Sequence, residues 1–293
     1  MSTRIKSAAV AIVIAVIALI LHGTIVFNLF IAFISALALY EIFRAVGADK
    51  YKPQLIACCT FAAVDAIMPF FYIHGWLYFI SYRLYMGIFV TVMCILYLKD
   101  HKKFNYNGFF AMTGATLLIT YSLGVLIKMA QESSVAYMLP KNERGGAQIF
   151  LLLLTLAGAW LADSGAYFVG TFFSKSGREV HHPWPEISPK KTIEGLVGGV
   201  ITNGVLLLII SFIYDMINDN VTIHYFVVFA AGMLCALIGL VGDLTASMVK
   251  RQTGIKDYGN IMPGHGGVMD RFDSVLLVAP FMYYLISQGL ILK

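Results

Sequence analysis

Runs of roughly 20 apolar residues follow one another along almost the whole chain, and short polar loops separate them. Because an α-helix of about 20 residues crosses the hydrocarbon core of a bilayer, this pattern predicts transmembrane helices. The alternating segments of about ten residues that are typical of a membrane barrel do not occur in the sequence. We therefore predict an all-α polytopic membrane protein with about nine transmembrane helices. Their expected ranges are 6–22, 25–44, 54–73, 78–98, 108–130, 148–170, 195–214, 222–246 and 274–292.

Composition agrees with this fold class and excludes an ordinary soluble domain. Hydrophobic residues make up 59% of the 293 residues, charged residues only 13%, and the mean hydropathy is +0.79. No soluble core would need so much apolar surface. The chain also changes character along its length, because residues 146–293 hold nearly all the polar clusters. We predict an N-terminal transmembrane region over 1–145, with about five spans, and a C-terminal region over 146–293, with about four spans, that performs the chemistry.

Positive charge in the loops predicts the orientation in the membrane. With a cytoplasmic N-terminus, sixteen of the 21 Lys and Arg residues lie on the inner side, as the positive-inside rule expects. The two long polar loops, 171–194 and 247–273, then also face the cytoplasm. We predict a multi-pass protein of the inner, cytoplasmic membrane. The same bias accounts for the net charge of +5, so the charge does not indicate nucleic-acid binding.

A carboxylate lies inside the predicted span 148–170, in the stretch Asp163-Ser164-Gly165-Ala166-Tyr167. An ionised side chain within a membrane costs several kcal/mol, so it usually faces a cavity or a partner. We favour a functional role for Asp163 over an aspartate satisfied by a neighbouring helix. For Asp65, which has no polar neighbours in sequence, we favour the structural interpretation.

The inner loop HHPWPEISPKKTIEG, residues 181–195, predicts a phosphate site. Ser188-Pro189 has the pattern of a helix N-cap followed by proline at the first helical position. Lys190 and Lys191 would then lie in the first helical turn, where they oppose the helix dipole unless an anion binds there. A solvated loop that follows the positive-inside rule explains the lysines equally well.

The segment 247–273, SMVKRQTGIKDYGNIMPGHGGVMDRFD, places charge between two apolar spans. Asp270 and Asp273 are three residues apart and share a face of an expected helix, and Asp243 ends the preceding span. Carboxylates so close together favour a bound cation, and oxygen ligands suit Mg²⁺. Basic residues would neutralise an anionic substrate; they are Lys250, Arg251, Lys256 and Arg271. Together these features indicate phosphoryl chemistry at the membrane surface.

This segment resembles the signature of the phosphatidate cytidylyltransferases, also called CDP-diacylglycerol synthases. The matching residues are Ser247, Lys250, Arg251, Lys256, Asp257, Gly259, Pro263, His265, Gly266, Gly267, Asp270, Arg271 and Asp273. The stretches 188–195 and 163–167 are similar to upstream elements of the family. The resemblance covers about 160–275 well, and the N-terminal half matches only as apolar spans. Met262 departs conservatively from the usual Leu, Ile or Phe.

The resemblance implies transfer of the cytidylyl group of CTP to phosphatidate, which gives CDP-diacylglycerol and pyrophosphate. The lipid phosphate is already an anion, so positioning and charge neutralisation should dominate catalysis. We expect Mg²⁺, with a second cation left open, and a site built by the two polar cytoplasmic loops. We expect metal binding by Asp243, Asp270 and Asp273, with Asp163 and Asp257 as secondary candidates. Phosphate binding is expected from Ser188, Lys190, Lys191, Lys250, Arg251 and Lys256, while Arg271 pairs with phosphate or a carboxylate, and His265, Gly266 and Gly267 shape the site.

Two other functions remain as alternatives. A transporter or channel also uses intramembrane carboxylates and broken helices, but here the charges gather at one face and no inverted repeat is visible. A CDP-alcohol phosphotransferase would show a DGxxAR…GxxxDxxxD pattern, which the sequence lacks. The expected partners are CTP, phosphatidate and the lipid bilayer. A homodimer stays open, and no nucleic acid is expected.

Overall fold

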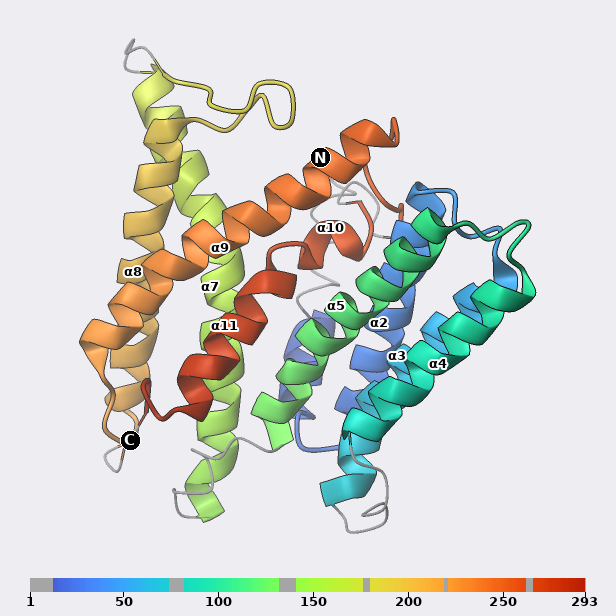
Figure 1. The fold of residues 1–293 in the computed structure, drawn as a ribbon. Coiled ribbons are helices and arrows are strands. Elements are labelled where there is room, and N and C mark those ends of the chain that lie inside the picture. The colour runs from blue at the N-terminus through green and yellow to red at the C-terminus, as the bar shows by residue number, and fades with distance from the viewer. Residues whose placement is uncertain are drawn as a thin grey trace. The chain divides into compact units, whose positions relative to one another are not determined.

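Helices make up most of the part of the chain that the structure describes. The computed structural model describes residues 13–73, 82–131, 141–175, 180–218, 221–261 and 266–292. Within these ranges, extended structure occurs as an isolated antiparallel bridge between Ile223 and Leu292. The named helices (Figure 1) are α2 Ile25–Ala45, α3 Lys52–Ile73, α4 Tyr82–Lys99, α5 Tyr106–Gln131, α7 Lys141–Lys175, α8 Ile193–Asp215, α9 Tyr225–Gln252, α10 Met269–Phe272 and α11 Val275–Ser287.

Six helices among the described residues are long and apolar enough to cross a membrane: α2, α3, α5, α7, α8 and α9. They confirm six of the predicted spans and a multi-pass membrane protein. The predicted span 78–98 coincides with α4, whose apolar stretch Leu84–Lys99 is shorter. The last predicted span holds α11, whose 13 residues extend only about 20 Å of the roughly 30 Å required. Most of the predicted span 6–22 lies outside the described residues, so the total of nine stays a prediction.

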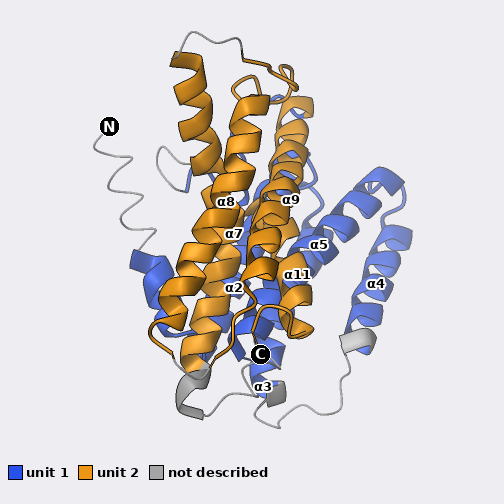
Figure 2. Ribbon diagram, turned by 90° about the vertical axis from the view of Figure 1, so that its left-hand side faces the viewer, with its two compact units in different colours: residues 1–131, 253–271 blue, residues 132–252, 272–293 orange. Residues whose placement is uncertain are grey.

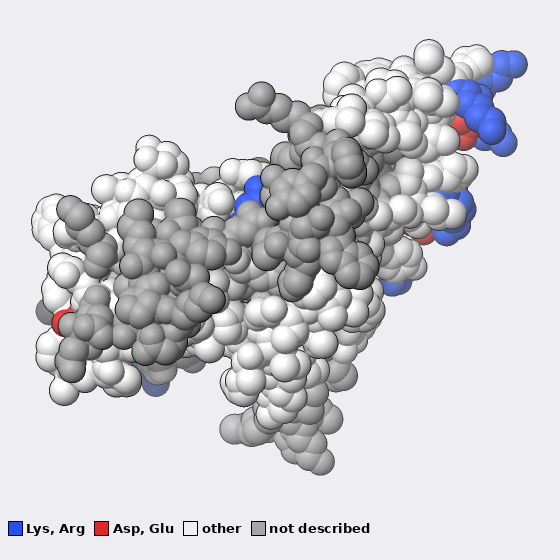
Figure 3. Space-filling model, turned by 90° about the horizontal axis from the view of Figure 1, so that it is seen from below, with Lys and Arg blue, Asp and Glu red and all other residues white. Residues whose placement is uncertain are grey.

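Large apolar side chains on the outer faces of these helices fit a lipid environment. Phe168 is 70% exposed and Phe226 is 83% exposed. On the face shown in Figure 3, most of the described residues are neither basic nor acidic. Large exposed apolar side chains such as these are typical of contact with a membrane or a partner.

The chain folds into two compact units that do not follow a single cut in the sequence. One unit comprises 1–131 and 253–271, and the other comprises 132–252 and 272–293 (Figure 2). The polar segment 253–271 therefore belongs with the N-terminal helices. The predicted boundary near residue 145 concerns where the chemistry lies, and this grouping of helices does not test it.

In the first unit, α2 packs against α3 and α5. The buried face of α2 includes Ile31, Ala38 and Leu39. Asn28 is fully buried on this helix, and its amide donates to the Ala66 carbonyl of α3 at 2.8 Å. This bond satisfies a polar group that would otherwise be costly in lipid.

In the second unit, α8 lies between α7 and α9 and approaches both at very short range. A Cβ at Gly199 would stand 2.7 Å from the Ala162 carbonyl oxygen of α7, so only glycine permits this approach. The buried Asn203 amide donates to the carbonyls of Gly158 on α7 and Gly232 on α9, at 3.0 and 2.7 Å. The close approach of the helix backbones and the hydrogen bonds of Asn203 hold α7, α8 and α9 together.

Candidate active site

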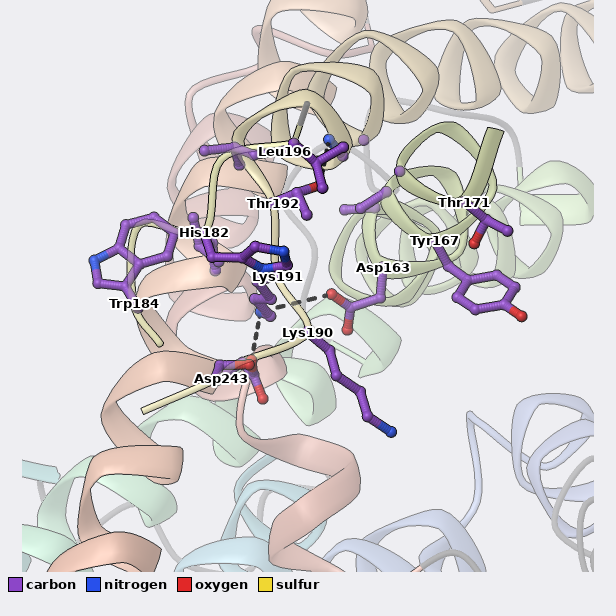
Figure 4. A pocket seen from close by; sticks show the side chains of 18 of the residues that line it. Asp163, Tyr167, Thr171, His182, Trp184, Lys190, Lys191, Thr192, Leu196 and Asp243 are labelled. Carbon is purple, nitrogen blue, oxygen red and sulfur yellow. Dashed lines mark hydrogen bonds and ion pairs between the residues drawn. The ribbon is translucent and has the colours of Figure 1, made fainter. Parts of the chain in front are cut away.

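A cavity of about 750 Å³ opens within the second unit, between α7, α8, α9 and the loop 180–192 (Figure 4). Its walls are mostly apolar. Its polar groups come from α7, from the loop before α8 and from the end of α9. The charged and aromatic side chains that line it are Asp163, Tyr167, Lys175, His182, Trp184, Lys190, Lys191 and Asp243. A volume of this size is typical of a small-molecule site.

Lys191 joins two carboxylates from different helices in this cavity. Its ammonium forms an ion pair with Asp243 of α9 and lies 4.0 Å from Asp163 of α7 (Figure 4). Lys191 and Asp243 are 24% and 22% exposed, whereas Asp163 is 66% exposed. A positive charge therefore occupies the space between the two carboxylates.

The start of α8 differs from the prediction. Ser188 and Pro189 do not cap the helix, because α8 begins at Ile193 with Thr192 as its N-cap. The Thr192 hydroxyl accepts a hydrogen bond from the Gly195 N–H at 3.0 Å, and this satisfies a donor of the first turn. The two lysines lie in the loop before the helix rather than in its first turn, and the Lys191 charge is paired with Asp243.

Two contacts hold this loop in place. The Arg251 Nε, at the end of α9, donates to the Ile187 carbonyl at 3.2 Å. The Glu194 carboxylate contacts His181 Nδ1 at 2.9 Å and accepts from the His181 N–H. His181 therefore meets a carboxylate, and Arg251 has a positioning contact that the sequence analysis did not foresee.

Asp273 lies next to the Asp243 charge in a buried environment. The residue is 9% exposed, and its Oδ1 accepts from the Ser274 N–H at 2.7 Å. Burial, followed by the charge of Asp243, raises the pKa of Asp273 to about 7. The charge of Asp163 acts in the same direction, while the Ser274 N–H and the Lys250 charge lower the pKa. Three carboxylates and a lysine therefore influence one another electrostatically.

Gly242 makes the approach of Asp273 to α9 sterically feasible. A Cβ at this position would stand 2.5 Å from the Asp273 carbonyl oxygen. The glycine that precedes Asp243 thus allows the turn at 273–274 to pack directly on the helix.

The remaining predicted residues of this unit surround the same cavity or lie near its carboxylates. Ser188 and Lys190 line the cavity. Lys190 points away from the Asp163, Lys191 and Asp243 group in Figure 4. Lys250 is close enough to Asp273 to affect its titration.

Another group of predicted residues lies in the first unit, in the segment 253–271. Asp270 Oδ2 accepts hydrogen bonds from the N–H groups of Tyr258 and Gly267, at 2.8 and 3.0 Å. The side chains of Lys256, Asp257 and Arg271 are exposed, and Gly266 has a φ of +82°. His265 lies outside the described residues. The roles predicted for these residues stay predictions.

Glu41, a buried carboxylate of α2, was not among the predicted site residues. It is 3% exposed and accepts hydrogen bonds from the backbone of the segment 253–271. The signal was available, because Glu41 interrupts a predicted apolar span just as Asp163 does.

The donor chemistry of the cavity fits a hard divalent cation, although a ready cage does not exist. Within the described ranges, no three His, Cys, Asp or Glu side chains form a group that could hold a metal ion. Asp163 and Asp243 nevertheless present oxygen atoms around the Lys191 ammonium, and oxygen ligands suit Mg²⁺. The position of the ammonium shows that this space accepts positive charge.

Comparison with known proteins gives consistent matches. The profile described as "Cytidylyltransferase family" matches residues 2–288. A phosphatidate cytidylyltransferase of Bacillus subtilis (strain 168) is 30% identical over 92% of this chain and 91% of its own length. A protein of the same name from Staphylococcus haemolyticus is 39% identical over 47% of this chain and 49% of its own. Another protein of this name, from Staphylococcus aureus (strain COL), is 41% identical over 44% of this chain and 46% of its own length.

Proposed function

Because the chain belongs to the cytidylyltransferase family, we propose that it transfers the cytidylyl group of CTP to phosphatidate. An oxygen of the phosphatidate phosphate forms a bond to the α-phosphorus of CTP. The bond between this phosphorus and the bridging oxygen of the β-phosphate breaks in line. CDP-diacylglycerol and pyrophosphate result, and pyrophosphate takes the electron pair of the broken bond.

The observation that supports this function best is the grouping of Asp163, Lys191 and Asp243 in a cavity of about 750 Å³. The two acidic side chains come from α7 and α9, and the basic one comes from the loop before α8. The cavity can therefore hold opposite charges side by side. A polyphosphate with its counter-cation requires this combination. The rest of the lining is apolar and suits an acyl chain of the lipid or the cytosine ring of the nucleotide.

We propose that Asp163, Asp243 and Asp273 hold the divalent cation, and that Asp270 contributes as the sequence predicts. When bound, Mg²⁺ would neutralise charge on the triphosphate and lower repulsion between the two substrates. Lys191 then exchanges its carboxylate partners for a phosphate oxygen. Ser188, Lys190, Lys250 and Arg251 add donors for the remaining phosphate oxygens.

The nucleophile needs no strong general base, because the phosphatidate phosphate is anionic near neutral pH. The protein's contribution is to position two anions and to stabilise the charge that develops on the leaving pyrophosphate. For CTP to reach the site, the cavity faces the cytoplasm in this proposal, with the N-terminus on the same side. The excess of Lys and Arg in the inner loops supports this orientation.

Labelled CTP tests the reaction directly. Purified protein in detergent receives phosphatidate, Mg²⁺ and CTP with label on the α-phosphate, and we expect label in the organic extract. With label on the γ-phosphate, the count should stay in the aqueous phase as pyrophosphate. Diacylglycerol in place of phosphatidate should accept no label, because it lacks the attacking phosphate.

Asp243→Asn is the matched negative variant, since the amide keeps the size but removes the charge that Lys191 neutralises. Folded wild-type protein that leaves all α-label in the aqueous phase would overturn the proposal. A transporter predicts that outcome, and a CDP-alcohol phosphotransferase predicts transfer only when CDP-diacylglycerol and an alcohol are supplied.

A further inference from the structure

Glu41 links helix α2 of the first unit to the polar segment 253–271. Glu41 Oε1 accepts from the Val268 N–H at 3.1 Å, and Oε2 accepts from the Met269 N–H at 2.8 Å. The carboxylate therefore engages two successive peptide groups with both of its oxygens. Val268 and Met269 lie 227 and 228 positions after Glu41 in the sequence.

The segment closes tightly around this carboxylate. A Cβ added at Gly259 or at Gly267 would collide with Glu41 Oε1. At Gly259 it would also stand 3.2 Å from the Gly267 Cα. Two glycines thus bring the backbone against Glu41 from two sides, and no other residue type fits either place without displacement.

Asp270 completes the arrangement from within the segment. Its Oδ2 accepts from the N–H groups of Tyr258 and Gly267, so two positions nine residues apart in the segment are held together. Glu41 holds the peptide groups of Val268 and Met269, which directly precede Asp270. The position of Asp270 therefore depends on Glu41, although the described contacts of Glu41 are to backbone groups.

We propose that Glu41 is a positioning residue that sets the place of Asp270 for cation and nucleotide binding. The proposal rests on the proposed function, in which Asp270 and Asp273 serve the cation. A glutamate that supported folding alone would affect the amount of folded protein. It would not affect the cation requirement of the folded fraction.

Glu41→Gln tests this with little change in shape. The amide has one acceptor oxygen, so one of the two N–H groups would face an NH₂ donor. We expect faster hydrogen exchange in peptides that cover 258–270. We also expect roughly a tenfold increase in the Mg²⁺ concentration for half-maximal turnover, with the KM for phosphatidate unchanged.

Asp65→Asn is the matched control. Asp65 is also a buried carboxylate of the first unit, 7% exposed on α3, and its Oδ2 faces Gly124 of α5. We expect the Mg²⁺ requirement and the exchange of 258–270 to stay as in the wild type. Gly259→Ala is a second test that leaves the carboxylate intact; its Cβ would collide with Glu41 Oε1, so it should separate the carboxylate from the segment and give the same changes as Glu41→Gln.

The outcomes separate this inference from the proposed function. Wild-type exchange of 258–270 in Glu41→Gln overturns the positioning role, whatever the activity. A wild-type Mg²⁺ requirement in an active Glu41→Gln or Gly259→Ala protein overturns it as well. Faster exchange in the variants, together with a folded wild type that transfers no cytidylyl group, supports the contact and overturns the proposed function instead.

Discussion

Replacing Gly242 with alanine tests whether α9 determines the position of Asp273. The new Cβ would stand 2.5 Å from the Asp273 carbonyl oxygen and 3.2 Å from the Ser274 Cα, whereas ordinary contacts begin at 3.4 Å. Both neighbouring atoms belong to the backbone, so a side-chain rotation cannot relieve the clash. The turn at 273–274 must move by several tenths of an ångström, up to about 1 Å, and the Asp273 carboxylate moves with it.

This displacement affects stability and activity to different extents. Overpacking of a close contact costs about 1–3 kcal/mol. At roughly 2–4 °C for each kcal/mol, Tm should fall by about 2–12 °C. Misplacement of a catalytic group by about 1 Å can reduce the rate about 100-fold, so we expect kcat/KM to fall about 10- to 100-fold.

Gly239→Ala provides the control on the same helix, three residues earlier. Its Cβ would meet the Ser274 Cβ at 3.5 Å, which is an ordinary contact. Both variants gain the same helix propensity, about 1 kcal/mol at most. Turnover of α-labelled CTP and thermal unfolding, followed by tryptophan fluorescence in detergent, measure the two effects. Equal activity and equal Tm in the two variants would refute the idea that this close approach positions Asp273.

Three other changes probe the same unit and its neighbour. The pKa of Asp273 is raised to about 7, so the stability that its protonated form contributes is full below its ordinary pKa near 3.8 and is lost as pH rises through about 7. Isothermal titration calorimetry should therefore show Mg²⁺ binding that strengthens between these two pH values and releases a proton. Binding of Mg²⁺ that does not depend on pH would contradict this. Asp273→Asn and Asp270→Asn should each abolish turnover in protein that remains monodisperse on size exclusion, since each removes a predicted cation ligand, and wild-type turnover in either would refute the metal role. Asn203→Ala should lower Tm by several degrees, because bonds of this kind contribute about 0.6–1.7 kcal/mol each in membranes, and an unchanged Tm would show that the amide does not tie α8 to its neighbours.

The long apolar helices were predictable because lipid leaves the chain few alternatives. A run of roughly 20 apolar residues that must satisfy its backbone internally becomes a helix, and α2, α3, α5, α7, α8 and α9 follow that rule. The short helices were less predictable. In α11 the apolar run 274–292 contains a helix of 13 residues that ends at Ser287, because Gly289 takes a positive φ. Hydropathy alone does not register such a turn.

The candidate site was predictable where charge stands out against an apolar background. Asp163, Asp243 and Lys191 were all identified on that ground, and they come together in the second unit. The capping prediction for Ser188 was wrong because Thr192 has the same capping chemistry and lies closer to the helix. Asp270 and Asp273 were treated as one pair, since three-residue spacing suggests a shared face. Their hydrogen bonds instead belong to different units.

The long separation between Glu41 and its donors has a consequence for biosynthesis. Val268 is 227 residues further along the chain than Glu41, and ribosomes add about 5–20 residues per second. Helix α2 therefore emerges roughly 10 to 45 s before the peptide groups that its carboxylate will bind. During that interval the first unit lacks the segment 253–271 that completes it. The N-terminal helices therefore cannot complete the packing of their unit until the segment 253–271 has been translated.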